Sequence, residues 1–384
     1  MLKINPTPKV RLGIIGGGLD SAVGRAHCSA LALDGLYEVL IGCYSRDQER
    51  NLLSNRLWKA REVTNDFRSF LSLKEDIDAV LVLTPTPSHF QIVSELLDLG
   101  FTVICEKSLT TNSPEALELL KASEKKHPIF VTFNYTGYPM VREMKSRISK
   151  NIYGNIHTVH IEMRQDSFTT TDGSGNPKKV QPWRLKDYEI PTVSLDLGVH
   201  VVNLFEFLTG ESIRDVVAIS SHKGIIANVV DNVHALAQSI NTTQVIFSYG
   251  KTFAGNKNGL KVWIYGEKGS ASWSQEFPNE IYEASMTGDI RTLTYSSEGL
   301  LEASKPRYSR FKVGHPVGFI EAFSNLYVDI YASLTQNAFD RNFVFGPKEA
   351  LTGLNTLEGI HTSSQTNQWV SVESLNETLM KGRS

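Results

Sequence analysis

Apolar and polar positions follow two patterns in the first 133 residues. Short, nearly continuous apolar runs, typical of strands buried on both faces of a parallel sheet, occur at residues 10–15, 37–43, 78–83, 101–105 and 129–133. Predicted helices lie between them: residues 22–33 and 89–99 have helical spacing of apolar residues, residues 48–58 form a polar helix, residues 66–73 a short one, and a capping serine with proline opens another at residue 113. This alternation predicts an α/β domain with a doubly wound parallel sheet.

The pattern changes beyond residue 151. Segments with β-type patterns then follow one another, at residues 156–163, 216–221, 232–239, 245–249, 260–265 and 270–274. They predict a second domain with a largely antiparallel open sheet. Helical patterns recur at residues 199–208, 318–334 and 348–365. A chain of 384 residues is long enough for two domains, and we place their boundary between residues 134 and 135.

Composition excludes several classes of partner. The formal net charge is −2 and no basic block is present, so we expect neither a nucleic-acid nor an acidic-membrane partner. No apolar run approaches the roughly 20 residues of a membrane span, and the first nine residues lack the apolar core of a signal peptide. Three scattered cysteines, Cys28, Cys43 and Cys105, favour buried reduced thiols and a cytoplasmic location. We expect no metal site.

A glycine-rich turn follows the first apolar run. Gly16 and Gly18 match the first two glycines of G-x-G-x-x-G, and Gly24 supplies the third if residues 19–21 are an insertion. Strand, glycine turn and helix in this order favour a dinucleotide whose pyrophosphate lies at the helix N-terminus. The alternative is a turn without a ligand. Asp20 lies within the insertion, close to where the phosphates are expected.

Two clusters follow predicted parallel strands, at the edge where open α/β sheets bind ligands. Thr84 and Pro85, with His89 nearby, follow the run at 78–83 and either form a wall beside a cofactor or simply end the strand. Glu106 and Lys107 follow the run at 101–105. A lysine in a closed site can hydrogen-bond a substrate hydroxyl and ease loss of its proton, whereas an isolated Glu-Lys pair is usually a solvated turn.

A third cluster contains Asp196, Gly198 and His200. Residues four apart share one face of a helix, so Asp196 and His200 can act together. An imidazole suits taking and returning a hydroxyl proton, and a carboxylate can orient it. Gly198 lets another group approach between them. The alternative is a helix-capping aspartate and a buried core histidine.

In order and spacing, these motifs resemble the Gfo/Idh/MocA family, named for glucose–fructose oxidoreductase and inositol dehydrogenase. The resemblance covers nearly the whole chain and rests on further motifs, namely His27 after Gly24, Asn134-Tyr135, Trp183-Arg184 and Gly314-His315-Pro316. It implies that residues 1–134 form a dinucleotide-binding Rossmann domain. Residues 135–384 would form a substrate-binding α/β domain whose open sheet often mediates oligomerisation, which implies a homodimer or homotetramer.

The resemblance also implies an activity. Lys107, Asp196 and His200 would be catalytic, with His200 as the acid/base, during hydride transfer between nicotinamide and a C–OH group of a sugar, inositol or sugar derivative. Two alternatives remain open: redox-neutral chemistry during glycoside cleavage or aldose–aldose exchange, and a non-catalytic NAD(P)-binding regulator. The family usually has proline, often cis, after Glu-Lys. Ser108 stands there in this chain, which leaves open a different backbone path for Lys107.

The chemistry at the end of the second strand bears on cofactor choice. Ser45 followed by Arg46 suits the 2′-phosphate of NADP, while Asp47 keeps NAD open, so we lean slightly to NADP. The expected cofactor-binding residues are Gly16, Gly18, Gly24, Ser45, Arg46, Thr84, Pro85, His89, Glu106 and Lys107. The expected substrate-binding residues are Tyr135, Arg164, Trp183, Arg184, His200 and His315, for which core packing is the alternative.

Overall fold

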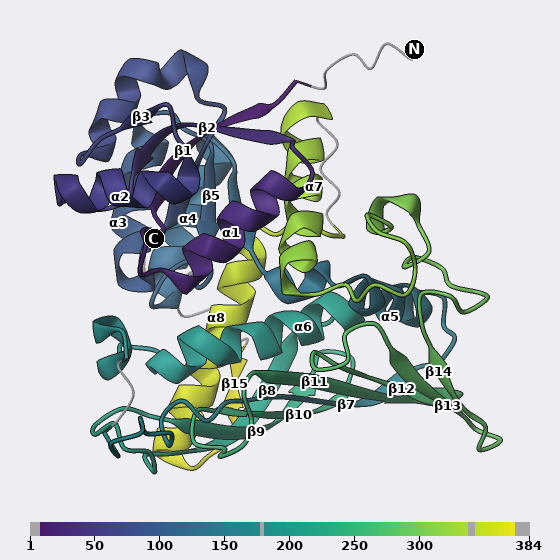
Figure 1. Ribbon diagram of the computed structural model, residues 1–384. Helices are drawn as coiled ribbons and strands as arrows, with labels where there is room; N and C mark the ends of the chain where they lie inside the picture. Colours follow the sequence, from purple (N-terminus) through teal and green to yellow (C-terminus); the bar gives the residue numbers. More distant parts are fainter. Residues whose placement is uncertain (1–7, 177–179, 337–341, 373–384) are drawn as a thin grey trace, which may run out of the picture. The chain divides into compact units, whose positions relative to one another are not determined.

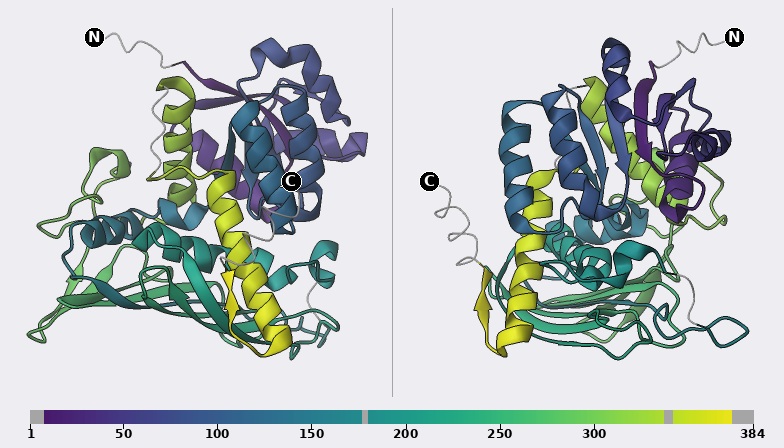
Figure 2. Two further views of the ribbon diagram at one scale, coloured as in Figure 1. Left: turned by 180° about the vertical axis from the view of Figure 1, so that it is seen from behind. Right: turned by 90° about the vertical axis from the view of Figure 1, so that its left-hand side faces the viewer.

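The computed structural model describes residues 8–176, 180–336 and 342–372. They form two compact units (Figures 1 and 2). The first comprises residues 8–110, 115–137, 318–336 and 342–348. The second comprises residues 111–114, 138–176, 180–317 and 349–372. The chain therefore enters the second unit briefly at residues 111–114 and again from residue 138, and residues 318–336 and 342–348 belong once more to the first unit.

The first unit is built on a six-stranded parallel sheet with strand order β3-β2-β1-β4-β5-β6. Its strands are β1 (Val10–Gly16), β2 (Tyr37–Cys43), β3 (Glu62–Val63), β4 (Ala79–Leu83), β5 (Val103–Glu106) and β6 (Ile129–Thr132). The order reverses between β1 and β4, and ligands of open α/β sheets bind outside the carboxyl ends of strands at such a point. The glycine turn lies there, because Gly16 pairs with Leu83 at the end of β4.

Helices flank this sheet in the doubly wound manner that the sequence predicted. They are α1 (Ala22–Leu33), α2 (Gln48–Trp58), η1 (Phe67–Asp76), η2 (Thr86–Ser88), α3 (His89–Asp98), α4 (Ser113–Lys125), η3 (Asn134–Gly137) and α7 (Phe319–Gln336). Helix α7 comes from the far end of the chain and packs against α1 and η3. Tyr37 donates its hydroxyl hydrogen to the carbonyl oxygen of Tyr327 at 2.7 Å, which ties α7 to β2.

The second unit is built on a nine-stranded sheet with order β14-β13-β12-β11-β7-β10-β9-β8-β15. β7 and β10 pair in parallel, and the other neighbours are antiparallel. The strands are β7 (Ile156–Arg164), β8 (Ile213–Ser221), β9 (Asn232–Ser239), β10 (Gln244–Gly250), β11 (Gly259–Gly266), β12 (Gly269–Ser274), β13 (Ile281–Ser285), β14 (Ile290–Leu293) and β15 (Val370–Ser371).

The helices of this unit cover one face of the sheet (Figures 1 and 2). α6 packs on β7 and β10, and α5 packs on β12. The helical segments are α5 (Pro139–Ser149), η4 (Pro182–Leu185), the π-helix η5 (Ser194–Gly198), α6 (Val199–Thr209), η6 (Pro306–Tyr308) and α8 (Pro347–Thr366). Burial alternates along the strands, as expected for an antiparallel sheet with one covered face.

The predicted α/β fold class is confirmed, and the predicted elements lie within a few residues of those observed. Helix α5 was missed, although its buried residues Met140, Val141 and Met144 lie at helical spacing. Its buried charges are paired: Glu143 accepts hydrogen bonds from the backbone N–H groups of residues 301–303, and Arg147 pairs with Glu283 at 2.6 Å. Charged residues between the apolar positions weaken the apolar pattern in sequence, and only the fold shows that these charges are buried and paired.

The three cysteines are free thiols, with Cys43 and Cys105 buried and Cys28 only partly so. Within the described residues, no helix combines the length and apolar character that a membrane crossing requires. The same residues contain no group of three or more His, Cys, Asp or Glu side chains placed to hold a metal ion.

Candidate functional site

The glycine turn has the close packing that a dinucleotide fingerprint requires. Gly16 and Gly17 have positive φ angles of 82° and 67°. A Cβ atom on Gly16 would lie 2.7 Å from the backbone of Leu83, and one on Gly24 would lie 2.5 Å from the carbonyl oxygen of Gly17. Gly24 therefore fills the role of the third glycine, which lets the helix pack closely on the turn. These backbone contacts fit a bound pyrophosphate.

The insertion at residues 19–21 helps to build the turn. Ser21 is the N-cap of α1, and its hydroxyl oxygen accepts a hydrogen bond from the Gly24 N–H at 3.0 Å. Asp20 pairs with Arg50 of α2, and both side chains are exposed. The carboxylate that lies in the turn is thus paired with a cation from the neighbouring helix.

At the end of β2, the side chain of Asn51 holds the backbone in place. Asn51 accepts hydrogen bonds from the N–H groups of Tyr44 and Ser45, each at 2.8 Å. Asp47 is the N-cap of α2, and its carboxylate accepts from the Arg50 N–H at 2.8 Å. The Asp47 carboxylate therefore already has a backbone partner.

Thr84 and Pro85 lie at the end of β4, beside the glycine turn. His89 is 1% exposed, and its ring bridges two carbonyl oxygens, those of Thr84 and Ser108, each at 2.7 Å. Burial lowers the pKa of His89, although both carbonyl contacts and the charge of Glu106 oppose the change. His89 ties the ends of two strands together instead of presenting a ring nitrogen to a ligand.

Glu106 ends β5 within a buried polar network. Its Oε1 atom accepts a hydrogen bond from Thr132 at 2.6 Å and lies 3.1 Å from Nε2 of His27. The other ring nitrogen of His27 lies 2.5 Å from the hydroxyl of Tyr327 in α7. Burial alone would raise the pKa of Glu106, but His27, Lys107 and Thr132 together bring it below its ordinary value. The network anchors the residue directly before Lys107.

Lys107 follows β5 at the carboxyl edge of the parallel sheet. The peptide bond between Lys107 and Ser108 is cis, the form that the family often has before its proline. Ser108 is 1% exposed.

In the second unit, Asp196 and His200 lie on consecutive helical segments. Asp196 belongs to the π-helix η5 and His200 to α6, and they are 7% and 6% exposed. Single π-helical turns are frequent at functional sites. A Cβ atom on Gly198 would lie 2.7 Å from the ring of Tyr249, so Gly198 lets that aromatic ring approach the helix.

Asp196 is held by two cations. Arg184 donates to both carboxylate oxygens, from Nε to Oδ2 at 2.9 Å and from Nη2 to Oδ1 at 3.0 Å. Lys251 approaches Oδ2 to 2.5 Å. The guanidinium of Arg184 also lies over the ring of Trp183, 4.6 Å from its centroid. The predicted residues Trp183, Arg184 and Asp196 thus form one group.

Three further predicted substrate residues, Arg164, His315 and Tyr135, have surroundings of their own. Arg164 ends β7 and pairs with Glu162 at 2.8 Å. Strand alternation places both on the sheet face opposite Met163, away from the face that α6 covers. His315 is exposed in the loop that precedes α7. Tyr135 is buried in the first unit, where its ring lies 6.4 Å from that of Phe319.

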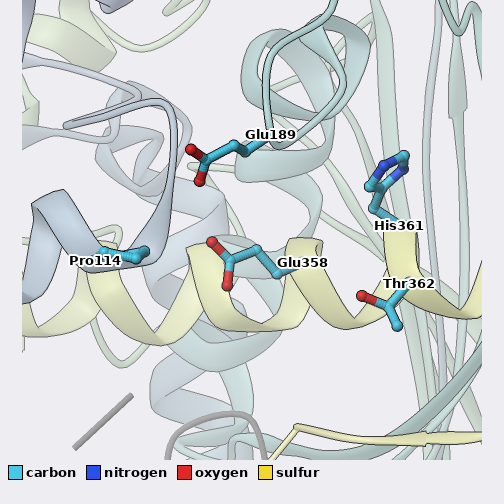
Figure 3. A pocket seen from close by; sticks show the side chains of 5 residues that line it. All are labelled: Pro114, Glu189, Glu358, His361 and Thr362. Atoms are coloured by element: carbon cyan, nitrogen blue, oxygen red, sulfur yellow. The ribbon is translucent and has the colours of Figure 1, made fainter. Parts of the chain in front are cut away.

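A separate cavity of about 210 Å³ lies in the second unit, lined by Pro114, Glu189, Glu358, His361 and Thr362 (Figure 3). The carboxylates of Glu189 and Glu358 face one another in it. Burial raises the pKa of Glu358, the charge of Glu189 adds to the rise, and a hydrogen bond from Ser113 opposes it. None of the predicted site residues lines this cavity.

Sequence reasoning missed Lys251, the second cation on Asp196. It directly follows β10, and a lysine immediately after a buried strand was an available but weak signal. It also missed Thr132, which donates to Glu106, and Tyr327, which contacts His27, because nothing in the local pattern links residues so far apart.

Comparison with known proteins decides the family. Residues 10–135 match the model of the oxidoreductase family with an NAD-binding Rossmann fold, and residues 141–272 match the GFO/IDH/MocA C-terminal domain. The chain belongs to the Gfo/Idh/MocA oxidoreductase family. The predicted family is therefore confirmed, as is the expectation of an oxidoreductase with an NAD-binding Rossmann domain.

Individual family members are similar over most of the chain. The uncharacterized oxidoreductase YfiI of Bacillus subtilis is 26% identical, covering 94% of this chain and 96% of the relative. The inositol 2-dehydrogenase of Rhizobium meliloti is 25% identical, covering 64% of this chain and 70% of the relative. The crystal structure of an oxidoreductase from Sinorhizobium meliloti has a TM-score of 0.83 at 28% identity, covering 94% and 99% of the two chains.

Proposed function

We propose that this family member is an NAD(P)-dependent dehydrogenase or reductase that transfers a hydride between nicotinamide and a C–OH carbon of a sugar, inositol or sugar derivative. The observation that carries the proposal is the buried carboxylate of Asp196, held by Arg184 and Lys251 on the segment that leads to His200. The similarity to an inositol 2-dehydrogenase supports the substrate class.

Each residue has a chemical role in this proposal. The bound nicotinamide supplies the hydride chemistry. The close-packed turn at Gly16 and Gly24 holds the pyrophosphate at the N-terminus of α1. Lys107 hydrogen-bonds the reacting hydroxyl and eases loss of its proton, which His200 accepts as general base and returns in the reverse direction. Asp196 is the carboxylate partner of this acid–base chemistry.

The cofactor preference is proposed to lean slightly to NADP. A small polar residue followed by arginine at the end of β2 suits a 2′-phosphate, and Ser45 and Arg46 provide that pair. Asp47 would favour NAD if its carboxylate accepted from the ribose hydroxyl. Instead it accepts from the backbone of Arg50 as a helix cap, which supports the NADP alternative.

We further propose a cytoplasmic homodimer or homotetramer that assembles through the open face of the nine-stranded sheet. Three free cysteines favour a reducing compartment. The open face carries a cross-strand row of paired residues, Leu236, Ile246, His160, Trp263, Ser272 and Tyr282. Leu236 is 53% and Tyr282 50% exposed, and exposed apolar surface of this kind marks interaction sites.

The direct test combines cofactor binding with turnover. Fluorescence titration should detect binding of NADH or NADPH, and failure to bind either would contradict the whole proposal. A panel of polyols, inositols and uronic acids, followed at 340 nm with both cofactors, should then identify a substrate. Binding without turnover of any member would favour the non-catalytic regulator instead.

Two variants test the proposed roles. Lys107→Ala and His200→Ala should each abolish turnover and leave cofactor affinity nearly unchanged, because neither side chain is expected to hold the pyrophosphate. A large loss of cofactor binding in both variants would show that they are structural residues.

A further inference from the structure

Lys251 is buried, and both its backbone and its ammonium group contact other residues. It is 3% exposed. Its backbone N–H donates to the carbonyl oxygen of Asp231 at 2.8 Å, and its carbonyl oxygen accepts from the N–H of Phe168 at 2.9 Å. Its ammonium group lies 5.1 Å from the centroid of the Phe168 ring and 2.5 Å from Oδ2 of Asp196. Both the start and the end of this side chain are therefore fixed.

The contrast with Lys257 defines what is unusual about Lys251. Lys257 lies six residues further along the chain and also pairs with an aspartate, Asp166, at 3.4 Å. Its side chain is 82% exposed, so solvent screens its charge and the pair contributes little. Solvent does not screen Lys251 in this way, because its side chain is buried. A buried ammonium group needs a paired charge to offset its loss of hydration, and Asp196 provides that charge.

Together, Lys251 and Arg184 restrict the Asp196 carboxylate. Two cations on one carboxylate stabilise its ionised form. The Arg184 fork fixes the plane of the group through both oxygens, and Lys251 adds a contact from a separate strand end. The result is one orientation for the carboxylate four residues before His200.

We propose that Lys251 is a positioning residue of the active site, which holds the Asp196 carboxylate in the orientation that its acid–base partnership with His200 requires. The inference rests on the proposed dehydrogenase function and extends it to a residue outside the D-x-G-x-H motif. Lys251 acts through Asp196, so its removal matters only while the Asp196 carboxylate is present.

The test measures turnover per cofactor-binding site, counted with NADPH or NADH according to which one the wild type binds, so that loss of folded protein is not counted as loss of catalysis. Lys251→Met removes the ammonium group and keeps the length of the chain. It should lower kcat per site by about 10- to 100-fold, the scale at which small misplacement of a catalytic group acts, with cofactor affinity unchanged. The matched control Lys257→Met should stay within about twofold of wild type, since its pair is exposed.

A second comparison separates positioning from folding. In an Asp196→Asn background, adding Lys251→Met should leave the residual kcat per site unchanged, and it removes the buried ammonium group that Asp196→Asn leaves without its carboxylate. An independent loss in that background would overturn the proposal, as would unchanged kcat per site in Lys251→Met alone. A wild-type protein that binds NADH or NADPH but turns over no substrate contradicts the proposed function itself. An active wild type with an unaffected Lys251→Met variant defeats only the positioning role.

Discussion

Asp20 stands in the turn that is expected to hold phosphates, and its carboxylate pairs with Arg50 of α2. Exposed ion pairs contribute only about 0–1 kcal/mol to stability. The main effect of this pair is therefore to offset the negative charge of Asp20 near the expected phosphates. It gives a physical account of how an acidic residue is accommodated beside a pyrophosphate. Arg50 is thus engaged by Asp20, whereas Arg46, just after β2, is the cation expected to bind a 2′-phosphate.

These two arginines should differ in their effects on cofactor binding. Arg46→Ala should weaken NADPH more than NADH, because only NADPH carries the 2′-phosphate. Arg50→Ala should weaken both cofactors alike, because it leaves the Asp20 charge unpaired beside the shared pyrophosphate, and adding Asp20→Asn should restore binding. Fluorescence titration with each cofactor measures both effects. Equal losses of NADPH and NADH affinity in Arg46→Ala would refute its proposed role.

At the scale of single elements, two helices of the second unit differ in whether their buried ionisable side chains have hydrogen-bond partners. On α5, Arg147 and Glu143 have partners in the neighbouring structure. On α6, the Oε1 atom of Glu206 is buried without a hydrogen-bond partner. Burial, reinforced by the charge of Glu349, raises the pKa of Glu206 well above its ordinary value.

Glu206 should therefore make stability fall as pH rises. The folded protein keeps the Glu206 proton at pH values where the unfolded chain has lost it, so stability declines from about pH 4.5 upward through the raised pKa. Glu206→Gln should remove this decline and raise the melting temperature more at pH 8 than at pH 5. A shift of equal size at both pH values would contradict the assignment.

Glu283 should have the opposite effect on how stability changes with pH, and it serves as a control. Burial would raise its pKa, but hydrogen bonds from Tyr153, Arg147 and Arg291 bring it below the ordinary value. Its stabilising contribution is therefore present above the pKa of the unfolded chain and is lost as pH falls through the lowered pKa. Glu283→Gln should destabilise the protein at pH 7, and the loss should shrink toward acid pH.

At the scale of the whole molecule, the second unit has one covered and one open sheet face. An extended sheet with exposed apolar residues on its open face is expected to pair with another protein surface. The stacked rings of His160 and Trp263, whose centroids lie 5.0 Å apart, stand in the middle of the cross-strand row. A second copy of this chain is the proposed partner.

Charge placed on the open face should separate the copies. Leu236→Glu and Tyr282→Glu each put a carboxylate into the proposed interface, and the double variant should have half the mass of the wild-type oligomer or less by light scattering after size-exclusion chromatography. Leu52→Glu, in which an exposed leucine of α2 in the first unit is replaced, should leave the assembly state unchanged. An unaltered oligomer in the double variant would place the interface elsewhere.

Local patterns were enough to predict most of the elements, the fold class and the family, with helix α5 as an exception. Strand and helix periods repeat within a few residues, and the run of glycines by itself indicates a turn where backbone segments approach closely. Asp196, His200 and Lys107 were named on the same local grounds, since each lies in a short motif of defined spacing. Their catalytic roles remain predictions.

Only the tertiary structure decided which distant residues meet. Helix α7 shows an apolar face in sequence, but nothing local says that it packs on α1 or that Tyr327 reaches His27. Lys251 meets Asp196 across 55 residues of sequence, and strand alternation at the end of β7 separates Arg164 from them. Ion pairs and packing partners are selected by the whole fold, because periodicity encodes which face is buried and not what that face meets.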